Sequence, residues 1–457
     1  MEKDQQYDQN LDQEQTGSDT ILFQPPGEED FPNGEEENIS IEDLLNRYLE
    51  EPSEPVAQEE NTEGAPETDA QRDTSAEPKG EEEPTIVKAP KRKGTTPWSV
   101  TWKITKYVWR IALGVVLAIG ILIMGLVGYL TVTEYNPAYA ETADRGSVNR
   151  SETITSDSFS ILTFNTGYAA LGADADFFMD GGKGVLPEDQ EWVEKNMEGI
   201  EGILSLADAD FIFLQEVDVG SQRSFHTNQW LKYEYGLREY ESRFALNYSC
   251  EYVPYPFTSP LGEVQSGLVT YSKYDIVSST RYSQPNGQAW PNRVANLKRC
   301  LLVSRIPIED SEQQLVLINV HMEDYDDAQL RKEQVQQLLE LMKEEYAKGN
   351  FVIAGGDFNQ IFPNSYAYKN PDDELWSPQR LGPASGGFRY IYDEENPTCR
   401  LLNQPYDPDS EDTRYYVIDG FLVSPNVSVS HIETLDYEFI YSDHNPVLLN
   451  FALNFDE

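Results

Sequence analysis

The chain has 457 residues and a formal net charge of -46. That length suits one large domain with appended segments, or two domains. Its three cysteines, Cys250, Cys300 and Cys399, are too few for a disulfide framework, although one pair could form. The sequence has no Cys/His spacing typical of zinc, so disulfide-stapled and zinc-finger classes are both excluded.

The charge is concentrated in the N-terminal fifth of the chain. Residues 1–87 hold 27 acidic and 4 basic residues and few aromatic ones. Such a segment cannot bury enough apolar surface to offset its ordering entropy, so we expect a disordered acidic tail. Within it, residues 40–51 have a capping-box start and apolar residues at helical spacing. They form either a docking helix for a cytoplasmic partner or a fleeting helix without one.

A basic segment and an apolar run follow the tail. Residues 88–110 contain seven basic residues and no acid, and residues 111–133 form an uncharged stretch of 23 residues. A helix of that length covers roughly the 30 Å hydrocarbon layer, which predicts one transmembrane helix. The basic side stays in the cytoplasm. The pattern therefore predicts a single-pass protein of the cell membrane whose remaining chain is extracellular.

Residues 134–157 are polar and indicate a stalk, and residues 158–457 indicate an α/β domain. Apolar strand-like runs occur at 159–164, 211–218, 266–272, 299–306 and 314–321. Residues 186–206 and 326–347 have helical periodicity, so strands and helices alternate in part of the domain. Residues 361–413 contain no confident element, and a span of that length is often a lid or specificity loop.

The run 351–359, FVIAGGDFN, carries two candidate site residues, Asp357 and Asn359. Its apolar residues predict a buried strand that stops at a tight turn formed by the two glycines, leaving both polar residues at the edge of a sheet. An Asx-turn, in which Asp357 only caps the chain reversal, is the alternative.

Other polar residues lie at or beside predicted strands in the same way. Residues 415–423 predict a strand with Asp419 in its middle, where a buried acid needs a partner. The other residues of this kind are Asn165, Glu216, His321, Asp443 and His444. Converging on one rim, such groups could hydrolyse a phosphate ester: carboxylates to bind Mg²⁺, a group to orient water, and imidazole or amide donors for the phosphoryl oxygens.

The runs TFNTG, LQEVD, NVHM, GGDFN, VIDGF and SDHNP occur in this order between residues 159 and 451. This arrangement resembles the endonuclease/exonuclease/phosphatase superfamily. The resemblance implies a four-layer α/β/β/α sandwich of two mixed sheets and a metal-dependent phosphoric ester hydrolase.

The resemblance also implies a role for each matched residue. Glu216 would bind Mg²⁺, or Mn²⁺, with Asn165 and Asp443 near the metal. Asp357 would position or deprotonate water, Asn359 would orient the phosphate, and His321 would donate to it. His444, held by Asp419, would contact the phosphoryl oxygens or act as the general base, so the choice of base stays open.

The sequence leaves the phosphate ester unidentified: a lipid head group, a sugar phosphate, a nucleotide or nucleic acid would each be chemically suitable. From residue 111 onward there are 53 acids and 23 bases, which disfavours a nuclease acting on DNA or RNA. A catalytically idle receptor or scaffold is a further alternative. Five basic residues are candidates for phosphate contacts or for surface salt bridges: Arg223, His226, Arg293, Lys298 and Arg299.

Overall fold

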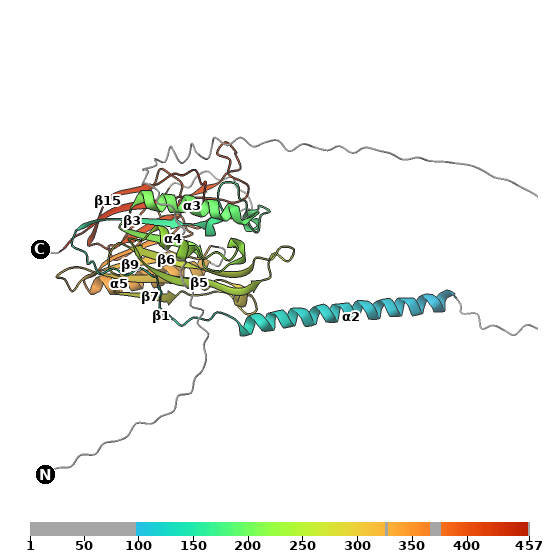
Figure 1. Ribbon diagram of the computed structural model, residues 1–457. Helices are drawn as coiled ribbons and strands as arrows, with labels where there is room; N and C mark the ends of the chain where they lie inside the picture. Colours follow the sequence, from blue (N-terminus) through green and yellow to red (C-terminus); the bar gives the residue numbers. More distant parts are fainter. Residues whose placement is uncertain (1–96, 325–327, 366–375, 456–457) are drawn as a thin grey trace, which may run out of the picture. The chain divides into compact units, whose positions relative to one another are not determined.

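The computed structural model describes residues 97–324, 328–365 and 376–455 of the chain. The acidic tail expected at residues 1–87, and the short helix expected at residues 40–51, lie outside these described residues. The described chain contains two seven-stranded sheets with an apolar core between them (Figure 1). The order and register of their strands position the candidate site.

Both sheets are mixed. The first contains, in spatial order, β1 (Ala140–Thr142), β7 (Ser278–Ser283), β8 (Cys300–Pro307), β9 (Gln314–His321), β10 (Phe351–Asp357), β14 (Asp419–Val423) and β11 (Arg389–Ile391). The second contains β15 (Val427–Thr434), β16 (Val447–Leu453), β3 (Ser158–Asn165), β4 (Phe211–Asp218), β6 (Gly262–Ser272), β5 (Glu241–Val253) and β2 (Asp144–Arg145). β9 pairs in parallel with β10, and β3 with β4, whereas the other pairs in these sheets are antiparallel.

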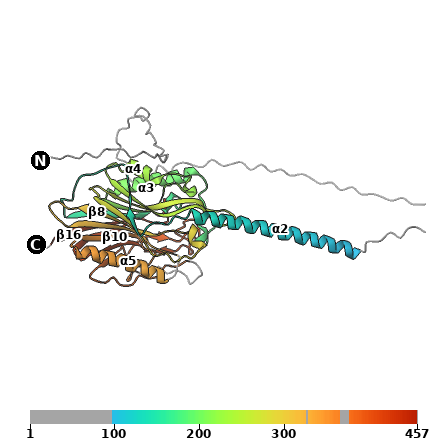
Figure 2. The same cartoon turned by 90° about the horizontal axis from the view of Figure 1, so that it is seen from below.

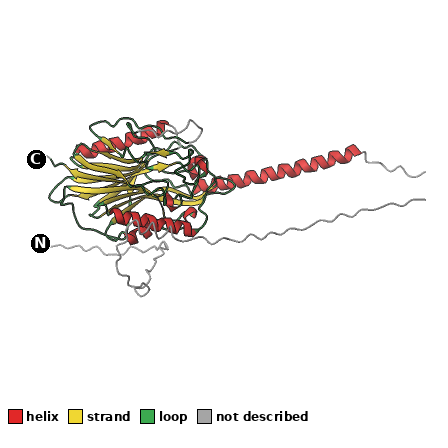
Figure 3. Ribbon diagram, turned by 90° about the horizontal axis from the view of Figure 1, so that it is seen from above, coloured by secondary structure: helices red, strands yellow, loops and turns green. Residues whose placement is uncertain are grey.

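Side chains along the strands alternate between two cores, as the two-residue period of a strand requires. On β4, Phe213 packs between the sheets, whereas Leu214 packs under α3 (Gln190–Ala207) and α4 (Gln229–Gly236). The other sheet is covered by α5 (Ala328–Ala347). Helices therefore lie outside both sheets (Figures 2 and 3). This is the four-layer α/β/β/α sandwich that the sequence predicts.

Part of the segment expected to be a stalk, 134–157, contributes a strand to each sheet instead. β1 pairs with β7, and β2 pairs with β5. Between these two strands, Ala143 is buried among Ala245, Leu268 and Leu302. The small apolar side chain enters the core while the backbone on both sides finds ladder partners. Residues 140–145 are therefore part of the domain, and the prediction of a free polar stalk is wrong for them.

The apolar run predicted at residues 111–133 lies, as far as Val132, in one long helix, α2 (Pro97–Val132). Thr101–Val132 is long and apolar enough to cross a membrane, and its most apolar window is exposed. Leu130, in the last turn, is different: it is only 3% exposed and packs with Tyr248 and Val264. The helix thus combines a span-like exposed surface with an end that contacts the domain.

All three cysteines are buried and unpaired, so the disulfide that the sequence left open does not form. Within the described part of 361–413, regular structure is limited to β11 and β12 (Cys399–Arg400), in line with the loop character expected there. β12 pairs with β13 (Tyr415–Tyr416) in a small two-stranded sheet.

Candidate active site

Three neighbouring strands of the first sheet bring His321, Asp357 and Asp419 into one row. In the register of β10, Asp357 is opposite His321 on β9 and opposite Asp419 on β14. The single strand predicted over residues 415–423 is wrong, because β13 and β14 are separate and Asp419 is the first residue of β14. The N–H of Asp419 donates to Thr398 Oγ1 at 3.1 Å, and this contact orients the start of β14.

β10 does not stop at Gly355 and Gly356, as predicted, but continues through both to Asp357. The glycines permit close packing on the two faces of the strand. A Cβ at Gly355 would lie 2.3 Å from the Phe421 ring, and one at Gly356, where φ is +144°, would lie 1.9 Å from the Val320 carbonyl oxygen. Glycine is therefore required at both positions. The close approach of the β10 backbone to β9 places Asp357 beside that strand.

Glu216 enters the site through a bulge in β4. The register between β4 and β6 shifts between Leu214 and Val217, and Glu216 has a φ of +56°. The bulge interrupts the alternation of the strand and re-aims the side chain. The Glu216 carboxylate lines the cavity, 3.9 Å from His321 Nε2. The acid is thus carried within the strand, not at its end.

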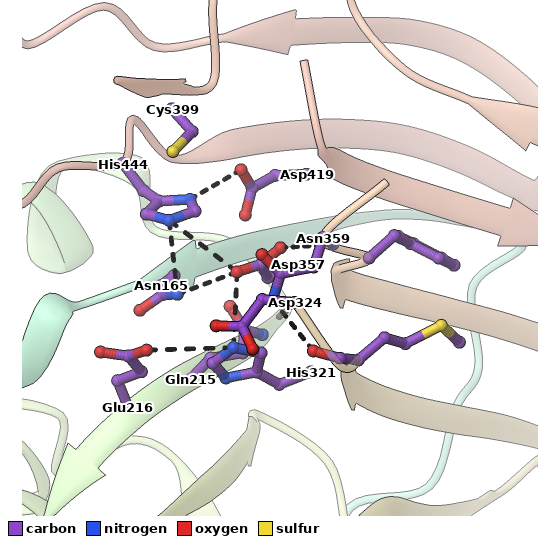
Figure 4. Close-up of polar contacts among 12 residues, drawn as sticks. Asn165, Gln215, Glu216, His321, Asp324, Asp357, Asn359, Cys399, Asp419 and His444 are labelled. Atoms are coloured by element: carbon purple, nitrogen blue, oxygen red, sulfur yellow. Dashed lines mark hydrogen bonds and ion pairs between the residues drawn. The ribbon is translucent and has the colours of Figure 1, made fainter. Parts of the chain in front are cut away.

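Asp357 lies at the centre of the polar group (Figure 4). Its Oδ1 accepts a hydrogen bond from the Asn359 N–H at 2.8 Å, and its Oδ2 accepts one from Asn165 Nδ2 at 3.1 Å. Oδ2 is also 3.5 Å from His321 Nε2 and 3.8 Å from His444 Nε2. Burial, followed by the neighbouring carboxylate on β14, raises the pKa of Asp357 to about 7. A carboxylate with that pKa can exchange a proton near neutral pH.

The two imidazoles beside Asp357 have opposite electrostatic surroundings. His444 Nδ1 is 2.8 Å from Asp419 Oδ2, and both side chains are buried. Although burial disfavours the imidazolium, Asp419 raises the pKa of His444 well above its ordinary value. Burial, followed by Arg299, lowers the pKa of His321 well below its ordinary value. The surroundings therefore favour the cationic imidazole at His444 and the neutral one at His321.

Asn165, Glu216 and Asp443 line the same cavity. Asn165 Oδ1 accepts a hydrogen bond from the Gly167 N–H at 3.1 Å. A Cβ added at Gly167 would be 2.9 Å from Asp443 Oδ1, so Gly167 also lies against Asp443. Burial is the main cause that raises the pKa of Glu216, to about 7, and that raises the pKa of Asp443. A divalent cation would stabilise both carboxylates in their charged form, and oxygen donors suit Mg²⁺ or Mn²⁺. These three residues therefore fit a hard divalent ion.

His444 belongs to two further groups of possible ligands. Within each group, the donor atoms lie within 4.8 Å of one another: Asp357, Asp419 and His444 in the first, and Cys399, Asp443 and His444 in the second. Both groups adjoin the oxygen donors described above, so a cation in this cavity would have more than one available ligand set.

Each of the five basic candidates has an acidic neighbour. The pairs are Arg223 with Asp218 at 3.0 Å, His226 with Glu263 at 3.8 Å, Arg293 and Lys298 with Glu134 at 3.3 and 3.0 Å, and Arg299 with Asp324 at 3.6 Å. Of these five, Arg223 and Arg299 line the cavity. The Arg223 guanidinium also stacks on the Tyr168 ring, 3.6 Å from its centroid. Acidic neighbours thus account for all five, and two of them also line the cavity.

Four polar residues to which the sequence analysis assigned no role support the site. Ser442 Oγ accepts from the His444 N–H at 3.2 Å, and Thr398 orients the start of β14 as described above. Between the sheets, Gln215 Nε2 donates to Asn319 Oδ1 at 2.8 Å. A polar residue inside an apolar run could have marked Gln215 and Asn319. Ser442 opens the SDHNP run, whereas Thr398 carries no signal, because it lies in polar loop sequence.

All eight residues singled out from the sequence lie close together. Seven line one cavity of about 790 Å³, and Asp419 lies behind His444. The seven are Asn165, Glu216, His321, Asp357, Asn359, Asp443 and His444. The arrangement places a carboxylate of near-neutral pKa, a cationic and a neutral imidazole, and a set of oxygen donors around one space.

Comparison with known proteins gives a family and several similar folds. Residues 162–444 match the endonuclease/exonuclease/phosphatase family. An endonuclease/exonuclease/phosphatase structure from Beutenbergia cavernae DSM 12333 is 18% identical, with a TM-score of 0.45, covering 65% of this chain and 72% of that one. TDP2 from D. rerio, complexed with single strand DNA product, is 16% identical, with a TM-score of 0.40, covering 65% and 99%.

ANGEL2, a 2',3'-cyclic phosphatase, is 13% identical, with a TM-score of 0.41, covering 68% of this chain and 99% of that one. No curated protein sequence matches the chain. The family match, however, extends over more than half of the sequence and contains all eight site residues. The chain belongs to the endonuclease/exonuclease/phosphatase family, whose members hydrolyse phosphate esters.

Proposed function

We propose that the chain is a membrane-anchored, divalent-metal-dependent phosphoesterase that hydrolyses a phosphodiester or phosphomonoester with water. The observation that carries this proposal is the surroundings of Asp357. Its carboxylate has a pKa of about 7 and lies between the neutral His321 and the cationic His444. A proton acceptor, hydrogen-bond donors and oxygen ligands around one cavity are the parts that ester hydrolysis needs.

The two candidate bases are separated by their electrostatics. His444 beside Asp419 is held as a cation, so it has no free lone pair on Nε2 with which to take a proton. Asp357 can take one near neutral pH. We therefore assign Asp357 as the group that orients and deprotonates water. His444 donates a charge-assisted hydrogen bond to the phosphoryl oxygens.

The remaining residues bind and orient. Asn359 orients the phosphate, and the neutral His321 donates a hydrogen bond to it. Glu216, with Asn165 and Asp443, would hold Mg²⁺ or Mn²⁺, which when bound supplies positive charge that stabilises the phosphoryl oxygens and the leaving oxygen.

Two other functions are less well supported. A nuclease acting on DNA or RNA outside the cell would be expected to carry an unpaired basic surface, yet two of the three arginines that line the cavity, Arg223 and Arg299, have acidic neighbours. A catalytically idle receptor or scaffold would not need competent chemistry at all eight positions. We therefore favour an active hydrolase of small phosphate esters or lipid head groups.

The location that we propose is the cell membrane, with α2 as the single span, the N-terminus in the cytoplasm and the domain outside. The basic residues of 88–110 and the apolar run of 111–133 support that orientation. Protease added to intact cells should remove the domain and spare the N-terminal tail. Loss of the tail with a protected domain would reverse the orientation.

The activity is tested with the full chain in detergent against a panel of esters: an activated diester, an activated monoester, DNA, RNA, nucleotides, inositol phosphates and sphingomyelin. We expect hydrolysis with Mg²⁺ or Mn²⁺, loss of activity in chelator, and loss in Asp357→Ala and in His444→Ala. Glu309→Ala, at an exposed acid outside the cavity, is the control. Undiminished turnover in both site variants would refute the assignment, and no turnover on the whole panel would favour the scaffold.

A further inference from the structure

The cavity that holds the candidate catalytic residues extends beyond them to α2. Four apolar residues of that helix form part of its lining: Ile123, Leu126, Val127 and Leu130. The lining of the cavity thus consists in part of polar and charged groups and in part of apolar helix residues. An inositol or sugar phosphate offers nothing apolar for the helix residues to contact. An amphiphile with a phosphate head group has a complement for both parts.

These helix residues lie within the stretch that can cross a membrane. From Ile123 to Val132 the helix advances about 14 Å, at 1.5 Å per residue. Over this length the domain packs on the helix, because Leu126 and Leu130 contact a cluster that contains Val253 and Leu261. If the helix spans the bilayer, these turns are the ones nearest its outer surface, and the domain residues that contact them lie at the same level.

Polar contacts at the end of the helix fix this junction. Glu134 pairs with Arg293 at 3.3 Å and with Lys298 at 3.0 Å. Trp290 Nε1 donates to Thr131 Oγ1 at 3.1 Å, while Trp290 is 59% exposed. A tryptophan with an exposed ring and a bonded N–H is typical of the boundary between membrane and water. The cavity therefore opens beside the point at which the span leaves the bilayer.

A row of three aromatic side chains lies at the opening of the same cavity. The Phe178 and Tyr255 rings are 5.5 Å apart, and the Tyr255 and Phe257 rings are 6.0 Å apart. All three line the cavity, and Tyr255 and Phe257 are 52% and 86% exposed. Met179, also in the lining, is 44% exposed. Large apolar side chains gathered at the mouth of a cavity mark a contact surface for another apolar body.

We propose that the substrate is a lipid of the same membrane, whose phosphate-ester head group enters the cavity while its acyl chains stay in the bilayer beside α2. The Tyr255–Phe257 segment inserts into the membrane surface and holds the mouth against it. This inference rests on the proposed function, because it names the substrate class of that site. The continuity of the cavity with the spanning helix distinguishes a lipid from a soluble ester.

The reaction that follows is hydrolysis. A water oxygen forms a bond to phosphorus, and the bond from phosphorus to one ester oxygen breaks. One proton of the water passes through Asp357, and the departing oxygen gains a proton to become an alcohol. The phosphate product keeps the second water hydrogen until it ionises. Nothing is oxidised or reduced, and water is the only co-reactant.

The test uses the full chain in vesicles of phosphatidylcholine, phosphatidylglycerol, phosphatidic acid and sphingomyelin with Mg²⁺, and measures release of the water-soluble product. The variant is Phe257→Asp, at an exposed position outside the catalytic group. Leu231→Asp, on α4 and 55% exposed, is the matched control because it places the same charge away from the cavity. Each protein is also assayed on a soluble activated diester.

We expect lipid hydrolysis by Phe257→Asp to fall about tenfold or more, because insertion of an aromatic ring is lost. Its hydrolysis of the soluble diester should fall much less than its hydrolysis of lipid, and the activity that remains shows that the variant is folded. An equal fall on both substrates would overturn the inference. The Leu231→Asp control should match wild type on both substrates. A wild type that hydrolyses the soluble diester but none of the four lipids overturns the inference and leaves the proposed function standing. So does a Phe257→Asp variant with full lipid hydrolysis, whereas a wild type inactive on every substrate overturns the proposed function itself.

Discussion

Replacing Asp419 with asparagine would remove the charge that stabilises His444 as a cation while preserving the shape of the side chain. Asp419 is 1% exposed, and its Oδ2 is 2.8 Å from His444 Nδ1. The amide oxygen of asparagine can still accept from that nitrogen, but it no longer stabilises the imidazolium by charge. We therefore expect Asp419→Asn to fold and to lose the cationic donor to the phosphoryl oxygens.

The expected size of the effect follows from the contact. A hydrogen bond to a charged group in a buried site contributes about 1.5–3 kcal/mol. If that contribution is made in the transition state, its loss lowers kcat by about 10- to 150-fold. KM should change less, because Asp419 lies behind His444 and is absent from the described lining of the cavity.

Two measurements check this prediction, and one control variant accompanies them. The first is kcat on a soluble activated diester at saturating Mg²⁺. The second is an NMR titration of the metal-free protein. The chain has only four histidines, so the His444 signal can be assigned. The pKa of His444 should be lower in the variant than in wild type. The control, Asp393→Asn, changes a buried acid outside the cavity that accepts from the Thr434 N–H at 2.9 Å, so kcat should be unchanged. A lower His444 pKa with kcat within twofold of wild type would refute the role of the cation.

Three further predictions concern stability. Although burial opposes ionisation, hydrogen bonds from Arg305 at 2.6 and 2.9 Å lower the pKa of Glu345 to about 2. At pH values above the ordinary pKa of glutamate, the ionised carboxylate therefore contributes up to about 3 kcal/mol to the free energy of unfolding. That stability is lost as pH falls from about 4.5 to about 2. In urea unfolding, Glu345→Gln should have a lower free energy of unfolding than wild type at pH 7, and the difference should narrow at pH 3. A difference that is the same at both pH values would contradict this dependence on the ionised carboxylate. Gly356→Ala should destabilise the domain by about 2–5 kcal/mol, because the added Cβ meets the Val320 carbonyl. Gly202 lies on α3 with open space around it, so Gly202→Ala should instead stabilise the domain by about 0.5–1 kcal/mol. Leu130→Ala should lower the free energy of unfolding in detergent by about 2–4 kcal/mol, and the exposed control Leu117→Ala should change it little; equal effects would mean that the helix end does not pack on the domain.

Much of the site could be predicted because its residues directly follow, or lie within, apolar runs. His321 and Asp357 end runs with strand character, and Asn165 ends another. A single polar residue at such a place is ordinary, so no one of them identifies chemistry. The motif order across the whole domain indicated the family, and the resemblance implied a sandwich of two mixed sheets. The pairing of strands that brings these residues together is known only from the structure.

What the sequence could not give is local backbone geometry. Glu216 faces the cavity only because β4 bulges there, and a bulge leaves no mark in a period-two pattern. The two glycines before Asp357 suggested a turn, since glycine is common in turns and also where strands pack closely. Deciding between these two uses requires the positions of Phe421 and Val320 in space. Both residues are far from the glycines along the chain, so the local sequence does not reveal them.

The lining of the cavity also explains why our proposed reaction would require a divalent ion for binding as well as for chemistry. The described lining contains six acids: Asp180, Glu216, Glu323, Asp324, Asp357 and Asp443. Its arginines are Arg223, Arg299 and Arg400, and the first two are already paired with acids. A phosphate ester brings one or two more negative charges into this space, and Coulomb repulsion is large where water is partly excluded. Added positive charge would offset this repulsion beyond what His444 and Arg400 supply, and the donors at Asn165, Glu216 and Asp443 offer a place for it. The acids that would repel the substrate alone are the same groups that would bind the cation that attracts it.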